Sequence, residues 1–457
     1  MKERTIRRDR YVEQLVARMH NGLVKIVTGI RRCGKSYLLF RLFRDYLLKH
    51  GVDRRHIVGI DLDDQEFADC RDPNRLFEAI ASRLPRDGKW TYVLIDEIQM
   101  CRKVRPKGVR LSDIAAEDRA DAYVTFYDVL NSLMKKPKVD VYVTGSNSRM
   151  LSTDVATNFR DRGFEIPLYP LTFSEFLPVS GMEKGEAIDW YMTWGGMPMA
   201  VLEKDDAVRS RYLKELFTKV YLNDIRERHQ LKDDLIASRV IDALCSAVGS
   251  LTNPHKLVLT LDSQGYAKTT DRTLKKYLDY FEDSFLFRRA ERYDVRGKKY
   301  LAYPQKYYAT DVGLRNARLN FRETDEAHLM ENVIFNELIA RGCNVDVGVV
   351  EIQRRGKDGK VRMRQHEIDF IVNFGTRKVY VQSAFRIADD EKREQEVASF
   401  RATGDFFRKI LVVSGYKQPM QDEEGVVVVG LIPFLLDESI LGTPLETSRS
   451  WRRSLPR

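Results

Sequence analysis

The chain has 457 residues, of which 43% are hydrophobic and 32% are charged, and this length predicts about two to four domains rather than one compact core. No apolar run approaches the roughly 18 residues of a membrane helix, and the five cysteines lack metal-ligand spacing, so we expect a cytoplasmic protein with reduced thiols and no membrane contact. The formal net charge of +10 permits binding to a polyanion but does not by itself indicate it.

The first third of the chain alternates short apolar runs with amphipathic stretches, which is typical of a parallel α/β sheet. We expect strands near residues 24–28, 57–61, 92–95, 139–144 and 164–168. Helical signals then run from about 171 to 240, interrupted by a turn at WGGMP. Short helices and a β-hairpin follow up to residue 315, and helix and strand signals mix again from residue 329.

The stretch TGIRRCGKSYLL, which starts at Thr28, follows an expected strand and leads into a helical pattern. Its G-x-x-x-x-G-K-S spacing is that of a P-loop, in which glycines let backbone N–H groups turn toward phosphates. Lys35 is expected to reach the β- and γ-phosphates, and Ser36 to bind Mg²⁺. The residues expected to line the nucleotide are Gly29, Ile30, Arg31, Arg32, Cys33, Gly34, Lys35, Ser36, Tyr37 and Asp96.

A second expected strand, YVLIDEIQ, ends in the acidic pair Asp96 and Glu97. Carboxylates at the end of a buried strand are costly unless they serve a cation or a reaction. Asp96 suits binding of Mg²⁺ through water, and Glu97 suits polarising the attacking water. The structural alternative is that the pair caps the next helix, but the P-loop upstream favours a nucleotide site.

A third expected strand, VYVTGSNS, also ends in polar residues. Either Ser146 or Asn147 is expected to hydrogen-bond the γ-phosphate or the attacking water, and Asn147 is the catalytic candidate. Three polar strand ends of this kind predict one shared site for a nucleoside triphosphate.

These motifs, in this order, resemble those of AAA+ ATPases, and in particular a prokaryotic family with an uncharacterised nuclease-like C-terminal domain. The similarity covers nearly the whole chain and rests on TGIRRCGKS, IDEIQ, TGSNSRMLS, PLTFSEFL, GGMP, YLNDIRERH, KYYATDVGLRN, ENVIFNEL and EIDFIV. It implies ATP with Mg²⁺ as the ligand, a homo-oligomer, and a parallel sheet of strand order 5-1-4-3-2.

The resemblance also implies how the chain divides. We expect an AAA+ core over residues 1–170, a helical lid over 171–240 and a winged helix over 241–315. A PD-(D/E)xK nuclease-like α/β domain is expected over 316–440, followed by a tail over 441–457.

The family usually carries a Gly-Arg pair just before the fifth strand. Here Arg162 takes the arginine position, while Asp161 replaces the glycine. An arginine at this place can stabilise transition-state charge at the nucleotide of a neighbouring subunit. Arg162 is the preferred candidate for this role and Arg160 is the alternative. The structural alternative is that the arginine lies at the edge of the strand and only pairs with a nearby carboxylate.

Basic residues crowd the expected hairpin near residues 288–299. They would give a winged helix a basic wing that contacts DNA phosphates, although acidic residues on the preceding helix, Asp279, Glu282 and Asp283, would repel a duplex. A winged helix that binds a protein is the alternative. The candidates for nucleic-acid contact are Arg288, Arg289, Arg292, Arg296, Lys298 and Lys299.

In the nuclease-like region, active relatives place a carboxylate and a lysine two residues apart on the last strand of the site. Here these positions hold Gln382 and Ala384. An amide is a poorer metal ligand than a carboxylate, and alanine carries no charge. We therefore expect a degenerate site, made of Glu331, Glu367, Asp369 and Gln382, without nuclease activity.

Two functions remain open at this point. The first is an ATPase that couples ATP turnover to a conformational change on double-stranded DNA or a DNA-associated complex. The alternative is a nucleotide-regulated signalling or defence switch that binds a protein partner through its C-terminal domains.

Overall fold

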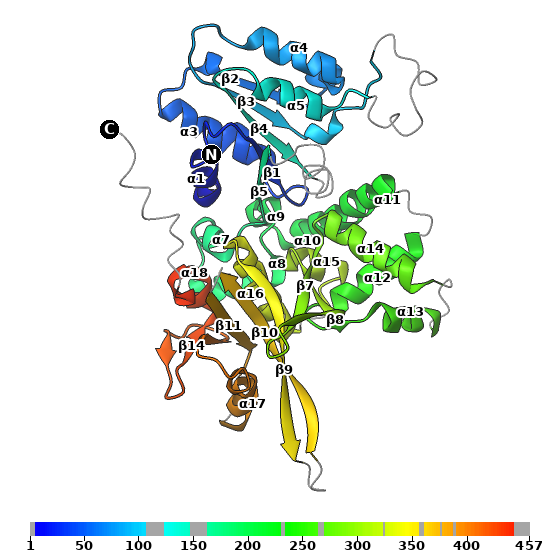
Figure 1. Cartoon of the computed structure of the whole chain (residues 1–457), viewed down its shortest axis with the longest axis vertical. Helices are drawn as coiled ribbons and strands as arrows, with labels where there is room; N and C mark the ends of the chain where they lie inside the picture. The colour runs from blue at the N-terminus through cyan, green and yellow to red at the C-terminus, as the bar shows by residue number, and fades with distance from the viewer. Residues whose placement is uncertain are drawn as a thin grey trace. The chain divides into compact units, whose positions relative to one another are not determined.

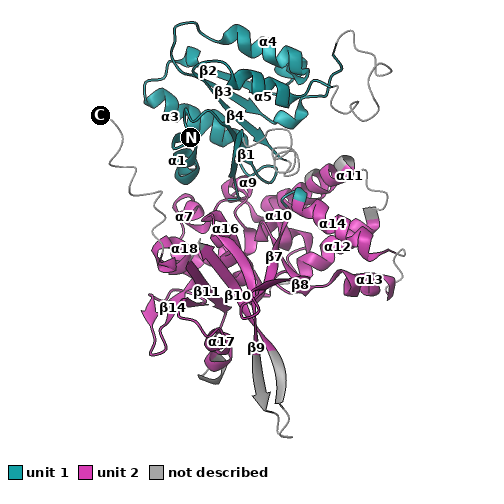
Figure 2. Cartoon of the chain, viewed as in Figure 1, with its two compact units in different colours: residues 1–170, 283–285 teal, residues 171–282, 286–457 magenta. Residues whose placement is uncertain are grey.

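The structure is a computed structural model that describes residues 5–106, 123–146, 162–229, 234–263, 269–322, 325–355, 361–374, 377–386 and 390–442. The chain divides into two compact units (Figure 2). Unit 1 comprises residues 1–170 and 283–285, and unit 2 comprises residues 171–282 and 286–457.

Unit 1 is built on a five-stranded sheet in which every pairing is parallel. The strand order β2-β3-β4-β1-β5 is the predicted order 5-1-4-3-2 read from the opposite edge, so the prediction of the sheet is confirmed. The strands are β1 (Val24–Thr28), β2 (Ile57–Asp61), β3 (Thr91–Asp96), β4 (Val139–Gly145) and β5 (Gly163–Pro167).

Helices cover both faces of this sheet (Figure 1). On one face, α4 (Pro73–Arg83) and α5 (Phe126–Met134) pack Leu76, Ile80 and Leu130 against valines and isoleucines of β1 to β4. On the other face, Phe43 contacts the ring of Tyr142, with centroids 4.6 Å apart. Phe43 belongs to a continuous helical stretch of α2 (Lys35–Tyr37), the π-helical η1 (Leu38–Phe43) and α3 (Arg44–Lys49), while α1 (Asp9–Val16) precedes β1.

Because the five strands are parallel, their carboxyl ends share one edge of the sheet. In the register, Asp96 of β3 lies beside Asp61 of β2, and Thr28 of β1 lies beside Gly145 of β4. This edge therefore gathers the end of β1, which leads into the glycine-rich loop, and the polar ends of β3 and β4.

Unit 2 holds a nine-stranded mixed sheet of order β13-β14-β12-β11-β10-β9-β7-β8-β6. The strands are β6 (Leu251–Thr252), β7 (Phe287–Asp294), β8 (Lys299–Ala309), β9 (Asn344–Arg355), β10 (Val361–Phe374), β11 (Arg377–Ala384), β12 (Arg408–Val413), β13 (Met420–Gln421) and β14 (Val426–Gly430). Strands β11, β12 and β14 pair in parallel, and β9 to β11 pair antiparallel.

The helices of unit 2 precede and flank this sheet. They are α7 (Phe173–Ser180), α8 (Lys184–Trp194), α9 (Pro198–Leu202), α10 (Asp206–Glu215), α11 (Asn223–His229), α12 (Asp234–Ser246), α13 (Pro254–Ser263), α14 (Asp271–Asp283), α15 (Val312–Arg318), α16 (Glu326–Ala340), α17 (Asp390–Arg401) and α18 (Leu431–Leu436). Helix α17 packs Val397 and Phe400 against the sheet core, and Phe335 of α16 stacks on Tyr308 of β8 at 4.1 Å.

The region predicted as a winged helix contains α12, α13 and α14 followed by the antiparallel hairpin of β7 and β8. This hairpin is continuous with the rest of the sheet, because β7 also pairs in parallel with β9. The lid, winged-helix and nuclease-like divisions remain predictions, since residues 171–282 and 286–457 cluster in one compact unit.

Two of the sequence phrases, GGMP and TDVGLRN, meet in a buried contact within unit 2. The Asp311 carboxylate accepts hydrogen bonds from the backbone N–H groups of Gly196 (2.7 Å) and Leu314 (2.9 Å). The Asn316 amide donates to the carbonyl groups of Met192 and Thr193 at the end of α8. These phrases therefore fix the turn between α8 and α9 against the start of α15.

Candidate functional site

The glycine-rich loop between β1 and α2 depends on two glycine positions. Gly29 has φ +144°, and a Cβ atom there would lie 2.1 Å from the backbone oxygen of Leu168. Gly34 has φ +100° and directly precedes α2. Residues with a side chain rarely adopt either of these backbone conformations. The two glycines therefore allow the backbone to turn back on itself between strand and helix, as a phosphate-binding loop requires.

Lys35 lies across this loop. Its side chain is buried, and its Nζ atom donates to the backbone oxygens of Gly29 (3.1 Å) and Ile30 (3.2 Å). The ammonium group is thus held over the concave side of the loop rather than in solvent. The position fits the predicted contact with phosphate oxygens, because those oxygens would offer the ammonium stronger, charged acceptors than carbonyl groups.

The far side of the loop is fixed by the N-terminal segment and the end of β5. Cys33 is fully buried, and its thiol donates to the backbone oxygen of Leu168. Arg8 donates to the backbone oxygen of Tyr169 at 2.7 Å and also reaches the backbone oxygen of Cys33. Cys33, which was predicted to line the nucleotide, therefore supports the loop from behind.

Ser36 and Asp96 meet at the carboxyl edge of the sheet. The Ser36 hydroxyl lies close enough to the Asp96 carboxyl group to lower the pKa of that carboxyl, and Asp96 is buried at the end of β3. The structure thus brings together the two side chains that were predicted to hold Mg²⁺. A hydroxyl and a carboxylate are oxygen ligands of the kind that Mg²⁺ selects, so these residues fit the ion.

Burial raises the pKa of Asp96, and the nearby Ser36 hydroxyl and the hydrogen bond from Thr144 counteract part of this rise. The physical cause is that a carboxylate at a buried strand end loses hydration. A divalent cation beside it would have the opposite effect, because it favours the charged form. The side chain is therefore arranged to be neutralised by a cation.

Thr144, on β4, connects the two acidic residues of β3. Its hydroxyl accepts from the backbone N–H of Glu97 (2.9 Å) and donates to Oδ1 of Asp96. Thr144 belongs to the motif VYVTGSNS, from which only Ser146 and Asn147 were predicted to take part in the site. The predicted strand order could have indicated this contact, because it places strand 4 beside strand 3 and so brings Thr144 close to Asp96 and Glu97.

Glu97 is half-buried and has φ +48°, an unusual conformation for a residue with a side chain. Its carboxylate accepts hydrogen bonds from the Gln99 amide and from the Ser146 hydroxyl (3.3 Å). The same Gln99 amide also donates to Ser146 Oγ at 3.0 Å. Gln99 and Ser146 therefore hold the carboxylate in a defined place, and Gln99 is a second residue without a predicted role.

Two of the predicted residues extend outward, and two others lie outside the described residues. Tyr37 is 37% exposed, and Arg32, with φ +66°, is exposed at the outer turn of the loop. Asn147 and Arg160 lie outside the described residues, so the choice between Ser146 and Asn147 rests on the described contact of Ser146 alone.

Arg162 lies at the opposite edge of the sheet from the loop. Its carbonyl oxygen accepts from the N–H of Val24 at the start of β1 (2.9 Å), and its guanidinium donates to Asn131 Oδ1 (3.0 Å) at an exposed site. The five residues of β1 separate it from the loop, which is a distance of roughly 15 Å. Its guanidinium is thus at the surface and distant from the loop of its own chain.

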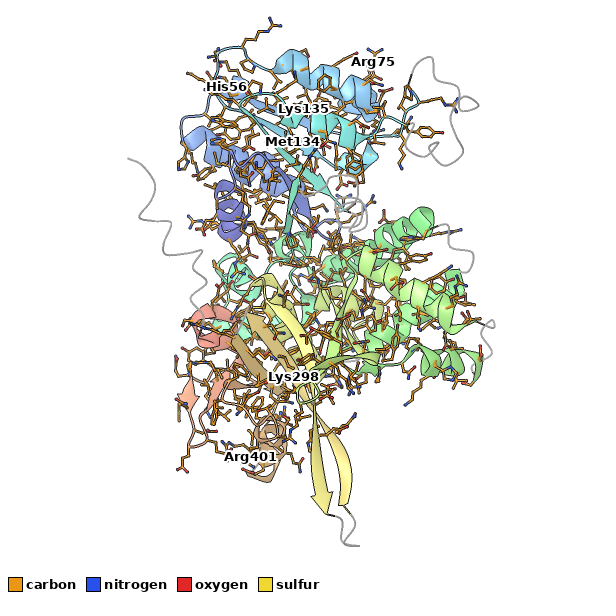
Figure 3. All side chains as sticks on the ribbon, viewed as in Figure 1. His56, Arg75, Met134, Lys135, Lys298 and Arg401 are labelled. Atoms are coloured by element: carbon orange, nitrogen blue, oxygen red, sulfur yellow. The ribbon has the colours of Figure 1, made fainter. Side chains whose placement is uncertain are left out.

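The six basic residues of the predicted wing differ in what they offer to a partner. Arg292 is buried and is therefore removed from the set of candidates. Arg289 lies 3.6 Å from the Glu282 carboxylate, and Arg296 donates to the backbone oxygen of Ala402. Lys298 in the β7–β8 turn (Figure 3) and the adjacent Lys299 are exposed.

The residues predicted as a degenerate nuclease site do converge in unit 2. The Asp369 carboxylate accepts from the backbone N–H of Ser383 (2.8 Å), and the Gln382 amide oxygen accepts from the N–H of Asp369 (3.2 Å). At the centre is a residue that the sequence analysis did not name: Lys306 of β8. Its Nζ atom lies 2.9 Å from Glu331, 2.6 Å from Glu367 and 3.7 Å from Asp369.

We call these four residues, Lys306, Glu331, Glu367 and Asp369, the Lys306 cluster. Burial would lower the pKa of Lys306, but the surrounding carboxylates outweigh it and raise this pKa. Burial also raises the pKa of Asp369 well above its usual range. The Lys306 side chain therefore stays charged, and its single positive charge faces three carboxyl groups.

Comparison with known proteins places this geometry in a family. A model described as an AAA domain matches residues 21–177, and a model of a domain of unknown function matches residues 185–325. The chain is 31% identical over 441 residues to an uncharacterized protein of Haemophilus influenzae, covering 95% of this chain and 100% of that protein. The chain belongs to the same family as this protein. Its unit 1 is an AAA+ P-loop module, because the AAA match includes the loop and the ends of β3 and β4.

The chain is also similar to more distant proteins. An uncharacterized protein of Methanocaldococcus jannaschii is 23% identical over 398 residues, covering 82% of this chain and 78% of that protein. Among solved structures, a Walker-type ATPase of Pyrococcus abyssi has 15% identity and a TM-score of 0.45, covering 70% of this chain and 97% of that one. This structural similarity is too weak to bear on function. Within the described residues, no helix has the length and apolarity needed to cross a bilayer.

Proposed function

We propose that this protein binds ATP with Mg²⁺ at the carboxyl edge of the unit 1 sheet and hydrolyses it to ADP and phosphate. The observation that carries the proposal is the interaction of the Ser36 hydroxyl with the buried Asp96 carboxyl group, which lowers the pKa of that carboxyl. It joins the start of the helix after the glycine-rich loop to the acidic end of β3, and these are the two elements between which a P-loop protein holds its metal and triphosphate.

Each side chain then has a role that its chemistry allows. Lys35 places a positive charge on the phosphates, and Ser36 with Asp96 would hold Mg²⁺, which neutralises charge that develops during phosphoryl transfer. Glu97 accepts a proton from, or orients, the attacking water. Gln99 and Ser146, which contact the Glu97 carboxylate, position that group.

The direct test is the rate of phosphate release from ATP by the purified full chain, with and without Mg²⁺. We expect Mg²⁺-dependent turnover that is lost in a Lys35→Ala variant. Binding of ATP should be followed separately by calorimetry, because absence of both binding and turnover in the folded wild type would contradict the proposal. Turnover without dependence on Lys35 would point to a contaminating ATPase.

We further propose that Arg162 acts on the nucleotide of a neighbouring subunit in a homo-oligomer. The proposal is supported by its exposure and by the sheet length that separates it from its own loop. Subunits carrying Arg162→Ala should be mixed with subunits carrying Lys35→Ala. In the mixed oligomer, a Lys35→Ala subunit brings an intact Arg162 to the intact loop of an Arg162→Ala neighbour, so activity should return above that of either variant alone. No recovery in oligomers shown to be mixed would contradict a role in trans.

The coupling of turnover to DNA rests on the exposed end of the β7–β8 hairpin. Lys298 and Lys299 are expected to contact phosphates of double-stranded DNA without reading sequence. Replacing both by Glu should weaken duplex binding and reduce the slope of log affinity against log salt by about 2. Lys204→Glu with Lys219→Glu is the charge-matched control, since both lysines are exposed in unit 2.

Stimulation of ATP turnover by duplex DNA decides between the two functional readings. Several-fold stimulation that is lost in the Lys298 and Lys299 variant supports an ATPase acting on DNA. Turnover that is indifferent to DNA, together with tightly retained nucleotide, instead favours the nucleotide-regulated switch with a protein partner.

A further inference from the structure

The Lys306 cluster lies where the family resemblance implies a metal-dependent nuclease centre. Its three carboxylates come from two elements that are distant in sequence from β8: Glu331 from α16, and Glu367 and Asp369 from β10. All three converge on one point, and the Nζ atom of Lys306 occupies that point. The ammonium group therefore stands where a divalent cation would be expected.

The lysine cannot readily leave this position. Its side chain is only 4% exposed, and its backbone lies in the middle of β8, paired with Ala290 of β7 and Leu251 of β6. Moving the ammonium out would leave three carboxylates uncompensated in a buried site, which is strongly unfavourable.

Two of the three carboxylates also accept hydrogen bonds from other groups of the protein. Glu331 accepts from the Tyr308 hydroxyl at 2.6 Å, and Asp369 accepts from the N–H of Ser383 at 2.8 Å. A Cβ atom added to Gly249 would lie 3.3 Å from the Glu331 carboxyl group, so the backbone closes the site on that side. Magnesium needs about six oxygen ligands and usually retains several waters, so an ion at this point would have to displace the Lys306 ammonium and its contacts.

The group also lacks the arrangement of a metal centre. Across the parts of the chain that the structure describes, no set of three or more His, Cys, Asp or Glu side chains is arranged to hold a metal ion. The residues therefore do not fit the metal that the resemblance implies.

We propose that Lys306 is a built-in cation that permanently replaces a divalent metal in unit 2. The ammonium neutralises the carboxylates and ties β8 to α16 and β10, so the former metal site becomes a fixed polar core. Unit 2 then binds its partners without metal chemistry. This inference concerns unit 2 alone, and it stands or falls independently of ATP hydrolysis at unit 1.

The test is a titration of the nucleotide-free full chain with Mn²⁺, followed by electron paramagnetic resonance. Wild type and Asp369→Asn should bind the same amount of Mn²⁺, because wild type has no Mn²⁺ site at Asp369. Lys306→Met, which keeps the length of the stem and removes the charge, should gain one Mn²⁺ per chain with at least about 30-fold higher affinity than wild type. Its melting temperature should also rise on addition of Mn²⁺.

Three controls make the result specific. Lys299→Met removes a charge from an exposed position of the same strand and should gain no Mn²⁺ site. Lys306→Arg retains the cation and should also gain none. Adding Asp369→Asn to Lys306→Met should abolish the gained site.

The proposal fails if wild type binds Mn²⁺ in a manner that Asp369→Asn removes, or if it cuts supercoiled plasmid in an Asp369-dependent reaction. Either result would show a relocated catalytic lysine rather than a substitute for the metal. A folded Lys306→Met variant that binds no Mn²⁺ would also overturn it. If that variant does not fold, the wild-type titration against Asp369→Asn still decides the question.

Discussion

The hydroxyl group of Ser36 lies beside the carboxyl group of Asp96 and lowers the pKa of that carboxyl, although 59 residues of sequence lie between them. Three parallel strands make this contact possible, because β1, β4 and β3 are consecutive neighbours in the sheet and end at the same edge. The contact therefore depends on the sheet order as much as on the two motifs.

Lys35→Ala should weaken ATP binding by roughly 10- to 100-fold, because the variant loses a charged hydrogen-bond donor to the phosphates. Calorimetric titration with a non-hydrolysable ATP analogue measures the change. Lys49→Ala is a suitable control, since Lys49 is an exposed lysine at the end of the same helical stretch. Equal affinities for the Lys35 and Lys49 variants would contradict the position assigned to the triphosphate.

Glu97→Gln should keep ATP binding but slow hydrolysis by roughly 10²- to 10⁴-fold, because an amide cannot accept the proton of the attacking water. Single-turnover phosphate release with saturating ATP separates this effect from binding. Hydrolysis at the wild-type rate would remove Glu97 from the mechanism.

Thr144→Val should lower both activity and stability. The valine keeps the shape of the side chain but loses the hydroxyl that accepts from the Glu97 N–H and donates to Asp96. Leaving these buried groups unpaired should reduce the free energy of unfolding of unit 1 by about 1–3 kcal/mol. Thr144→Ser retains the hydroxyl and should behave like wild type in chemical denaturation and turnover, whereas similar behaviour of both variants would argue against this role.

Asp311 should make the stability of unit 2 depend on pH. Burial raises the pKa of Asp311 to about 6, despite hydrogen bonds from backbone N–H groups that lower it. Because the folded state then binds the proton more tightly than the unfolded state, stability should fall as the pH rises from about 4 to about 6, by an amount on the order of 3 kcal/mol.

The measurement is urea denaturation of wild type and Asp311→Asn at pH 4.5 and pH 7. The stability of wild type relative to the variant should be greater at pH 4.5, since the asparagine does not titrate. A pH-independent difference between the two proteins would show that Asp311 has the same pKa in both states.

Gly196→Ala should destabilise the turn between α8 and α9. An added Cβ atom would lie 2.1 Å from the backbone oxygen of Leu171, which forces the backbone to shift and should lower the free energy of unfolding by about 1–3 kcal/mol or more. Gly185→Ala is the matched control, because a Cβ atom there meets nothing within 4 Å. It should leave stability unchanged or raise it by up to about 1 kcal/mol.

Local sequence patterns predicted the strands of unit 1 well. Val24–Thr28 and Ile57–Asp61 form strands with the predicted bounds, since short, mainly apolar runs followed by glycine or acidic residues are typical of buried parallel strands.

The sequence pattern by itself could not identify which side chains contact these motifs in the folded protein. Ser146, which follows β4, contacts Glu97 at the end of β3, and no local spacing records this contact. Arg292 carries a charge in a basic run, yet its position in β7 buries it. Charge in a sequence predicts a surface, but the pairing of a strand decides which of its side chains face that surface.

Lys306 shows most clearly what only the tertiary structure decided. The sequence alone determined that the expected lysine position holds Ala384 and that one carboxylate is replaced by Gln382. It could not show that a lysine from β8, more than 60 residues upstream of its nearest β10 partner, fills the centre of the acidic group. Electrostatic compensation acts through space, whereas a sequence motif records only neighbours along the chain.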